Sequence, residues 1–394
     1  MKKVLITTTT YPLNERDTQP RFIYSLADKL SDNFDVTVLA PRGIAAKKDE
    51  KIGRVIVRRY PYFISKFETL VYGGGILENL RANRLRYVQI PFLFIAQFFS
   101  IWKIIKKKNI EIINAHWIIP QGLVAILVKK LSRKRVKVII TSHGGDLYGL
   151  RFLNRIKTWT LNNADSIVVV SSAMKNFCYN NLGVDSAKII YIRSMGVNLT
   201  STFVQKVNFE DKKNIIFVGR IAEKKGLPIL ITALNILHKQ GIKLNLTVVG
   251  DGNGLAEIIS QVERFNLTDY VTFKGRVINS EIPAILNKHA IFVMPSIVAD
   301  DGDQEGLGLV AIEAMGCGCA VIATDLEAIR DVINSGETGI LFEPGNEKDL
   351  ANQIRLLDSN IALRFKYAGA GNRFALNKFD WSKVIRNYSE ILRV

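Results

Sequence analysis

Two glutamates eight residues apart, Glu305 and Glu313, enclose a glycine-rich segment, Glu-Gly-Leu-Gly-Leu-Val-Ala-Ile-Glu. The pattern predicts that Glu305 precedes a helix and that Glu313 lies about two turns along it, at most about 12 Å away at a rise of about 1.5 Å per residue. Backbone N–H groups at such a helix start suit a diphosphate, and each carboxylate can accept hydrogen bonds from the hydroxyls of a sugar ring. The segment therefore predicts a site for two sugar rings joined by a diphosphate. A polar loop followed by a helix face that carries a glutamate is the alternative interpretation.

Two cations stand in a comparable position further upstream. Arg220 and Lys225 follow the end of a predicted strand at Gly219 and precede the next helix. Both side chains can converge on one anion at that helix start, where N–H groups already favour negative charge, and such cations stabilise a departing phosphate. Because surface lysines and arginines near a turn are common, this pattern indicates an anion site only together with other signals.

Other ligand classes fit the sequence poorly. The glycine-rich turn 250–254 follows a predicted strand, but Leu255 stands where a dinucleotide-binding fingerprint requires glycine, so a structural turn is expected. The acidic loop 300–304 lacks the glutamate that closes an EF-hand loop. The three cysteines show no framework spacing, and the pair in 317–319 has no further ligands nearby, which indicates a reducing compartment. No metal and no cofactor is expected.

Apolar, β-branched runs alternate with longer helical patterns along the 394 residues, which is typical of parallel sheets covered on both faces. Six strands are expected in each half: 3–8, 36–40, 111–115, 136–142, 166–171 and 188–192, then 214–219, 244–250, 271–274, 290–294, 320–324 and 339–342. These sets predict two doubly wound α/β domains with a boundary in the polar segment 194–209.

The strand pattern also predicts how the chain is divided. We expect a first domain over residues 1–200, a second over 201–375, and an amphipathic C-terminal helix over 376–394 that packs back on the first domain. Ligands of such sheets bind at the carboxyl ends of the strands, so a central cleft between two facing domains is expected.

The net charge of +18 is concentrated in the first half of the chain. Residues 1–205 hold 32 Lys and Arg against 13 Asp and Glu, whereas residues 206–394 hold 22 against 23. Basic clusters such as Lys106-Lys107-Lys108 follow apolar stretches, which suits an anionic membrane surface, although a solvated face accounts for them equally well. The apolar stretch 88–102 is shorter than the roughly 20 residues that span a bilayer, and the N-terminus is too quickly polar for a signal peptide. A cytoplasmic protein is expected, and a peripheral position on the inner face of the membrane is one of the two interpretations of its basic half.

Five motifs occur in one order in the second half. They are Phe-Val-Gly219-Arg220 with Lys225-Gly226, Val-Val-Gly250-Asp251-Gly252, Phe-Lys-Gly275-Arg276-Val277, Met294-Pro295-Ser296, and Glu305 to Glu313, followed by Gly316 and Asp325. This order resembles the donor-binding half of glycosyltransferase family 4 (group 1 glycosyl transferases), densely over residues 212–350 and more thinly in the first half. The resemblance implies the GT-B fold of two Rossmann-like domains. It also implies a retaining hexosyltransferase that moves a sugar from a nucleotide-sugar donor to a saccharide or diphospho-lipid-linked acceptor, in polysaccharide or glycolipid biosynthesis of the cell envelope.

The resemblance assigns roles to individual residues of the second half. Arg220 and Lys225 would bind the donor diphosphate and stabilise its departure. Glu305 would hold hydroxyls of the transferred sugar, and Glu313 would hold the ribose. Backbone contacts to sugar, phosphate and base would come from Gly306, Leu307, Gly308 and Leu309 and from the turn Gly275, Arg276 and Val277. Gly219 is a further donor-binding residue. The resemblance implies no obligatory metal.

In the first half the resemblance rests on His143-Gly144-Gly145-Asp146 after a predicted strand. It implies that His143 steadies the donor sugar, with a turn-capping histidine as the alternative. His116 ends another predicted strand and is an acceptor-side candidate, equally plausible as a structural residue. Many relatives carry a Gly-Gly loop after the first strand, whereas residues 11–21 here contain no glycine and approach a ligand less easily by backbone. We expect Arg16 or Arg21 to contact the acceptor instead.

Two other functions account for parts of the sequence. A sugar-nucleotide epimerase of GT-B fold would use the same donor site and need no acceptor. A nucleic-acid-binding protein would explain the basic first half. That half lacks interleaved aromatic and basic strand motifs, so no nucleic-acid partner is expected.

Overall fold

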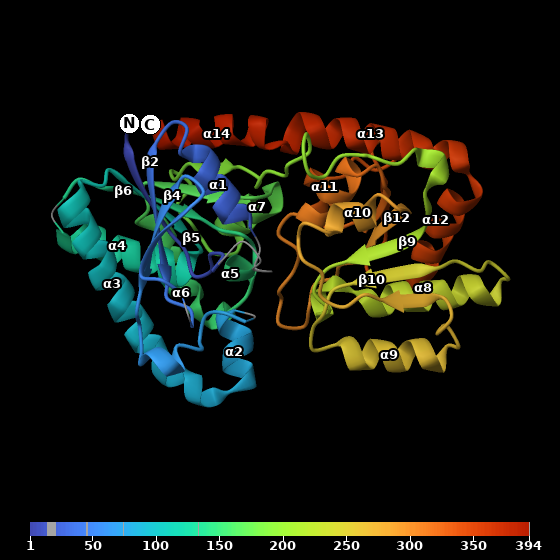
Figure 1. Ribbon diagram of the computed structural model, residues 1–394, viewed down its shortest axis with the longest axis horizontal. Helices are drawn as coiled ribbons and strands as arrows, with labels where there is room; N and C mark the ends of the chain where they lie inside the picture. Colours follow the sequence, from blue (N-terminus) through green and yellow to red (C-terminus); the bar gives the residue numbers. More distant parts are fainter. Residues whose placement is uncertain (14–20, 45, 74, 133, 394) are drawn as a thin grey trace. The chain divides into compact units, whose positions relative to one another are not determined.

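The computed structural model describes residues 1–13, 21–44, 46–73, 75–132 and 134–393, and the chain divides into two compact units (Figure 1). Unit 1 comprises Met1–Val170, Met174–Arg193 and Ile385–Val394, and unit 2 comprises Ser171–Ala173 and Ser194–Val384. Each unit is built around a sheet of its own.

Unit 1 has an eight-stranded sheet in the order β3-β4-β2-β1-β5-β6-β7-β8. All neighbours pair parallel except β3 and β4, which pair antiparallel. The strands are β1 Lys3–Thr7, β2 Asp35–Pro41, β3 Asp49–Ile52, β4 Val55–Tyr60, β5 Ile112–His116, β6 Lys137–Thr141, β7 Ser166–Val169 and β8 Ile190–Ile192.

The prediction of six strands in this half is wrong by two, because β3 is polar and two arginines interrupt the apolar pattern of β4. Strand β3 is Asp-Glu-Lys-Ile at the sheet edge, and β4 contains two arginines. Arg59 of β4 is nevertheless buried, since its Nε donates to Glu50 of β3 at 2.7 Å and its guanidinium donates to the carbonyl oxygen of Pro12 at 2.7 Å. Val55 and Val57 of β4 are buried at alternate positions, and the ion pair between Arg59 and Glu50 joins this strand to β3.

The helices of unit 1 are α1 Phe22–Leu30, α2 Ile76–Ala82, α3 Gln89–Lys108, α4 Leu123–Ser132, α5 Gly145–Tyr148, α6 Asn154–Asn162 and α7 Ser172–Asn180, whose first two residues count with unit 2. The C-terminal helix α14, Trp381–Arg393, begins five residues later than predicted because α13 continues to Phe379. Its last turns belong to unit 1, where the hydroxyl of Tyr388 lies 2.7 Å from Thr141 Oγ1 and accepts a 3.4 Å hydrogen bond from the Asn114 amide.

Unit 2 has a six-stranded sheet in the order β11-β10-β9-β12-β13-β14, parallel throughout. Its strands are β9 Lys213–Val218, β10 Leu246–Val249, β11 Val271–Phe273, β12 His289–Met294, β13 Ala320–Thr324 and β14 Ile340–Phe342, which confirms the six predicted. Its helices are α8 Leu227–Lys239, α9 Leu255–Arg264, α10 Ile282–Leu286, α11 Leu309–Gly316, α12 Glu347–Ser359 and α13 Ile361–Phe379. A core of buried aliphatic side chains from β9, β12, α8 and α12 fills the space between sheet and helices.

Each sheet has one topological switch point, where the strand order changes direction. In unit 2 it lies between β9 and β12, and in unit 1 between β1 and β5. Since the strands on both sides are parallel, the loops that follow them leave the same edge of the sheet, and this edge is where doubly wound sheets bind ligands. The predicted residues Gly219, Lys225 and Glu305 follow β9 and β12, whereas His116 and His143 end or follow β5 and β6.

Candidate functional site

The loops at the switch point of unit 2 are joined through their backbones. A Cβ on Gly226 would lie 1.8 Å from the carbonyl oxygen of Pro295, and one on Gly250 would lie 1.8 Å from that of Gly219. Gly250 N–H donates to Gly275 O at 2.8 Å and Gly219 N–H donates to Val249 O at 3.0 Å. The chain can approach this closely only with glycine at 226 and 250, where φ is also positive. These contacts bring the predicted residues Gly219 and Gly275 to one edge.

Charged side chains connect the same two loops. The turn Glu223–Lys225 before α8 faces the acidic loop after β12: Lys225 Nζ lies 2.5 Å from Glu305 Oε2, and Lys224 Nζ lies 2.9 Å from Asp303 Oδ2. All four of these side chains are partly buried. The predicted cation Lys225 and the predicted carboxylate Glu305 are therefore in direct contact, although eighty positions separate them in the sequence.

The Glu305 carboxyl is held ionised in a place that would otherwise favour its protonation. Burial raises the pKa of this carboxyl. The adjacent Lys225 ammonium, the more distant Lys224 and the N–H of Gly306 lower it by more than burial raises it, so the pKa lies below the ordinary value. A carboxylate with this environment accepts hydrogen bonds and donates none.

The segment after Glu305 leads directly into α11. Gly306, Leu307 and Gly308 precede the helix, Leu309 is its first residue, and Gly308 is the N-cap with φ +92°, without a side chain that caps the N–H groups. The predicted helix start is thus confirmed, and its first amides are not satisfied by a side-chain cap. Because the helix begins only at Leu309, the rise of about 1.5 Å per residue applies from there to Glu313 and not from Glu305.

Glu313 lies on the second turn of α11 and is only partly exposed. Burial raises the pKa of its carboxyl to about 8, and within the described part of the chain no hydrogen bond or ion pair to this carboxyl is found. A half-buried carboxyl without a partner of its own is suited to accept hydrogen bonds from a bound diol.

The two predicted arginines differ from Lys225 in their burial. Arg220 and Arg276 are exposed at the ends of β9 and β11, and Val277 beside Arg276 is partly buried. Gly275 has φ +62° and open space at its Cβ position. Among the described residues, no hydrogen bond or ion pair joins Arg276 or Val277 to the Lys225–Glu305 pair.

In unit 1 the two predicted histidines contact each other. His116 Nδ1 lies 2.9 Å from His143 Nε2, with the rings inclined by only 7°. Phe22 and Trp117 pack against the His143 ring at centroid distances of 4.9 and 5.4 Å. Burial lowers the pKa of His143 to about 3, and it lowers that of His116 well below the ordinary value, so both rings are neutral at neutral pH. One ring nitrogen of the pair donates and the other accepts.

Asp146 fixes the loop that carries His143, a role that the sequence does not reveal. Its carboxylate accepts hydrogen bonds from Ile118 N at 2.8 Å, from Ser142 Oγ at 2.9 Å and from His143 N at 3.1 Å. Burial nevertheless raises the pKa of this carboxyl. The motif His-Gly-Gly-Asp is thus a closed turn that presents an imidazole.

Of the two predicted acceptor arginines, Arg16 is outside the described residues. Arg21 is the N-cap of α1, with its guanidinium carbon 5.1 Å from the centre of the Tyr24 ring, and it directly precedes Phe22, which packs on His143. The buried Arg59, which sequence reasoning missed, holds this loop through the Pro12 carbonyl.

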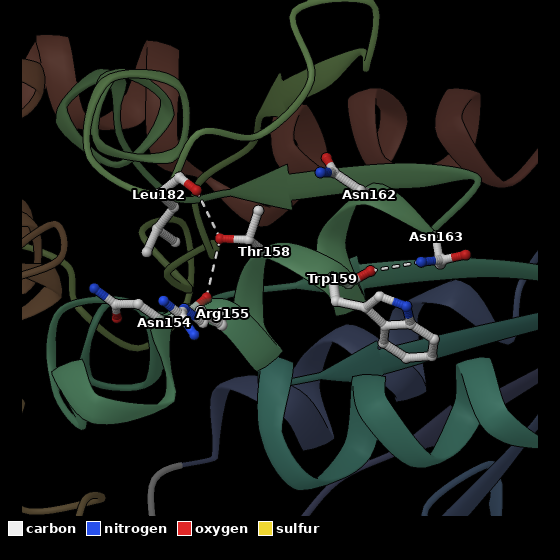
Figure 2. A pocket seen from close by; sticks show the side chains of 7 residues that line it. All are labelled: Asn154, Arg155, Thr158, Trp159, Asn162, Asn163 and Leu182. Carbon is white, nitrogen blue, oxygen red and sulfur yellow. Dashed lines mark hydrogen bonds between the residues drawn. The ribbon is translucent and has the colours of Figure 1, made fainter.

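A surface hollow of about 450 Å³ lies on α6 in unit 1, away from these residues. It is lined by Asn154, Arg155, Thr158, Trp159, Asn162, Asn163 and Leu182 (Figure 2). The Thr158 hydroxyl bonds to the carbonyl oxygens of Asn154 and Leu182, at 2.9 and 2.6 Å. None of the predicted site residues lines it. Within the described ranges no group of three His, Cys, Asp or Glu is placed to hold a metal, and all three cysteines are buried free thiols.

Comparison with solved structures defines the class of the fold. Sucrose-phosphate synthase of Thermosynechococcus elongatus superposes with a TM-score of 0.79 at 18% identity, covering 100% of this chain and 98% of that one. The Anabaena protein HepE in complex with UDP-glucose superposes with a TM-score of 0.75 at 17% identity, covering both chains fully. The two parallel-sheet α/β units therefore form a GT-B fold, as predicted.

Comparison of sequences defines the family. Residues 19–199 match the family described as Glycosyltransferase Family 4, and residues 200–371 match Glycosyl transferases group 1. An uncharacterised glycosyltransferase of Methanocaldococcus jannaschii is 32% identical over 332 residues, which cover 82% of this chain and 86% of the relative. N-acetyl-alpha-D-glucosaminyl L-malate synthase of Bacillus anthracis is 23% identical over 330 residues, covering 82% and 84%. The chain belongs to the group 1 glycosyltransferases of family 4, which confirms the resemblance.

Proposed function

We propose that this glycosyltransferase moves a hexose, with retention of anomeric configuration, from a nucleoside-diphosphate sugar to a saccharide or lipid-linked acceptor of the cell envelope, at the cytoplasmic face of the membrane. The observation that carries the donor part is the Lys225–Glu305 pair, 2.5 Å apart beside the uncapped start of α11. The complex of HepE with UDP-glucose, in a protein of the same fold, supports a nucleotide-sugar donor.

The paired charges match a ligand that offers both acceptors and donors of hydrogen bonds. The Lys225 ammonium has three N–H groups, of which Glu305 takes one, so two remain for phosphate oxygens. The Glu305 carboxylate accepts from sugar hydroxyls. Gly306 to Leu309 contribute backbone N–H groups, and Glu313 accepts from the ribose hydroxyls. A sugar joined to a nucleoside through a diphosphate meets all of these requirements.

The same residues account for the chemical step. The bond from the anomeric carbon to the diphosphate oxygen breaks, and negative charge develops on the phosphate, where Lys225 and Arg220 stabilise it. The acceptor hydroxyl forms the new bond to the anomeric carbon on the same face and gives its proton to the departing diphosphate oxygen. The family resemblance implies that His143 steadies the donor sugar. His116 would then act as a positioning residue, since its hydrogen bond sets which nitrogen of His143 carries the proton.

Thermal stabilisation by UDP, GDP and ADP and by their hexose derivatives tests the donor site. Lys225→Ala should weaken the response to nucleotide and to nucleotide sugar alike, because it removes a phosphate contact. Glu305→Gln should weaken only the additional response to the sugar. Asp303→Asn is the matched control, since it breaks the neighbouring ion pair with Lys224 between the same two loops. If no nucleotide stabilises the folded protein, or if the control behaves like Glu305→Gln, the assignment of this site is wrong.

A further inference from the structure

Helix α3 of unit 1 is apolar on both sides but is covered on only one. The covered stripe, which includes Leu93, Gln97 and Ile101, packs on the sheet, where the Gln97 amide donates to Thr7 Oγ1 of β1 at 3.3 Å. The opposite stripe is Val88, Phe92, Ile95 and Phe99, at spacings of four, three and four residues, and these side chains are between 47% and 63% exposed. A helix on the surface of a soluble domain ordinarily carries polar residues there.

The exposed stripe continues onto the loop after β4. Phe63 packs edge-on against Phe92 with ring centres 5.4 Å apart, and the following residues Ile64 and Phe67 are also exposed. We define the apolar face as Ile64, Phe67, Val88, Phe92, Ile95 and Phe99. An exposed apolar surface of this kind marks a place of contact with another molecule.

Cations flank the apolar face at both ends of the helix. Residues 81–108 contain seven Lys and Arg and no Asp or Glu. Arg81, Arg84 and Arg86 precede α3, and four lysines occupy its end, where Lys106 Nζ lies 4.8 Å above the Trp102 ring. Aromatic and aliphatic side chains with lysine and arginine beside them are the composition of helices that lie in the boundary between lipid headgroups and acyl chains.

The length and apolar composition of the same helix also suit a membrane span, but its burial in the protein does not. The continuous helical segment Arg84–Lys108 has 25 residues and includes 18 consecutive residues that are apolar enough for a span, and in the described part of the chain it is the helix that meets the length and composition of a span. The expectation that this stretch is too short therefore needs correction. However, a third of these 18 residues is buried in the protein, and Leu93, Gln97 and Ile101 are fully covered. Inserting the helix across a bilayer would strip these side chains from the sheet of unit 1.

We propose that the apolar face of unit 1 docks on an anionic lipid bilayer, with its aromatic side chains in the interface and the flanking lysines and arginines on the headgroups. The concentration of cations without acidic residues selects lipid over a second copy of the chain, because two such faces would repel each other. This surface would bring the enzyme to the lipid-linked acceptor, a role that rests on the proposed function. Binding to vesicles needs no nucleotide sugar, so it succeeds or fails independently of the donor site.

Flotation of the full chain with vesicles tests the proposal. Vesicles of phosphatidylcholine alone are compared with vesicles that contain about 30% phosphatidylglycerol, at a salt concentration of about 0.15 M. The variant Phe92→Glu/Phe99→Glu should lower partitioning by about tenfold or more, and Lys106→Gln/Lys107→Gln should lower the preference for anionic vesicles. The control Phe152→Glu/Ile189→Glu changes side chains that are 82% and 63% exposed elsewhere in unit 1 and should bind like the wild type. A circular dichroism spectrum and a urea unfolding transition like those of the wild type show that the variants are folded.

Three results would overturn the proposal. The wild type could fail to float with anionic vesicles, or Phe92→Glu/Phe99→Glu could float as well as the wild type. Sedimentation could also show that the wild type is a dimer without lipid and that this variant is a monomer, which would make the face an interface between copies of the chain.

Discussion

Replacing Glu313 by glutamine should stabilise unit 2 at alkaline pH while it weakens donor binding. The carboxyl on α11 has a pKa of about 8 because it is buried without a partner among the described residues, against an ordinary value of 4.5. Below pH 4.5 the carboxyl is protonated in both the folded and the unfolded chain, so it has no effect on stability there. Between the two pKa values the unfolded chain loses the proton and the folded chain retains it, so the free energy of unfolding falls as the pH rises.

The size of this effect follows from the two pKa values. One pKa unit corresponds to about 1.4 kcal/mol, so the full interval amounts to at most about 5 kcal/mol. Since the side chain is partly exposed and solvent screens it, we expect about 2–3 kcal/mol in practice. Glutamine keeps the shape of the side chain and carries no ionisable group.

Urea unfolding at about pH 4.5 and about pH 8.5 measures the difference. Wild type and Glu313→Gln should have the same free energy of unfolding at the lower pH, and the variant should be more stable by about 2–3 kcal/mol at the higher pH. Glu263→Gln, on the exposed side of α9, is the matched control and should differ from wild type by less than about 0.5 kcal/mol at both values. Donor affinity measured at about pH 8.5, above the pKa of Glu313, should fall by about tenfold in Glu313→Gln, because the ribose hydroxyls then lose a carboxylate.

A contrary outcome is readily recognised. If Glu313→Gln is less stable than wild type at the higher pH, the carboxylate has a native partner and its burial has been misinterpreted. If stability rises but donor affinity does not change, Glu313 is a structural residue of α11 and does not hold the ribose.

Two further predictions concern the frame of each unit. Gly226→Ala should destabilise unit 2 by about 3 kcal/mol or more, because its Cβ would lie 1.8 Å from the Pro295 carbonyl oxygen. In the control Gly241→Ala, φ is also positive but no atom lies within 4 Å of the Cβ position, so the loss should be only about 1 kcal/mol. Equal losses of the two variants in urea unfolding would contradict the steric explanation. His116→Leu should lower kcat about tenfold with little change in the KM for the donor. His116→Asn retains a polar atom near the Nδ1 position and should restore part of the lost kcat. If the NMR signals of His143 are unchanged in His116→Leu, His116 does not set the tautomer of His143.

The grouping of Lys225 and Glu305 at one edge of the unit 2 sheet could be predicted, because it depends on the order of strands and helices along the chain. The alternation of strands and helices placed Gly219 and Lys225 after one strand and Glu305 after another, and parallel strands bring such loops to one edge. The contact between the Lys225 and Glu305 side chains could not be predicted, because it depends on the close approach of Gly226 to Pro295.

The remaining features arise from tertiary burial. The sequence does not reveal that Glu313 lacks a partner, since this depends on everything that surrounds α11. The pairing of the two histidines had a weak signal, because His116 ends β5 opposite Thr141 of the neighbouring β6, two residues before His143. Strands β3 and β4 were missed because Arg59 is buried through an ion pair with Glu50, which no hydrophobic pattern records.

The glycine contacts between the loops of unit 2 have a consequence for protein engineering. The loops after β9, β10 and β11 are fixed to one another by main-chain atoms, through Gly219, Gly250 and Gly275. The exposed side chain of Arg276, in the turn after β11, can therefore be exchanged with little cost to folding, provided that the glycines remain. Because the family resemblance implies that this turn contacts the nucleotide base, we propose libraries that vary Arg276 and Val277 on the unchanged glycine frame as a test of nucleotide preference.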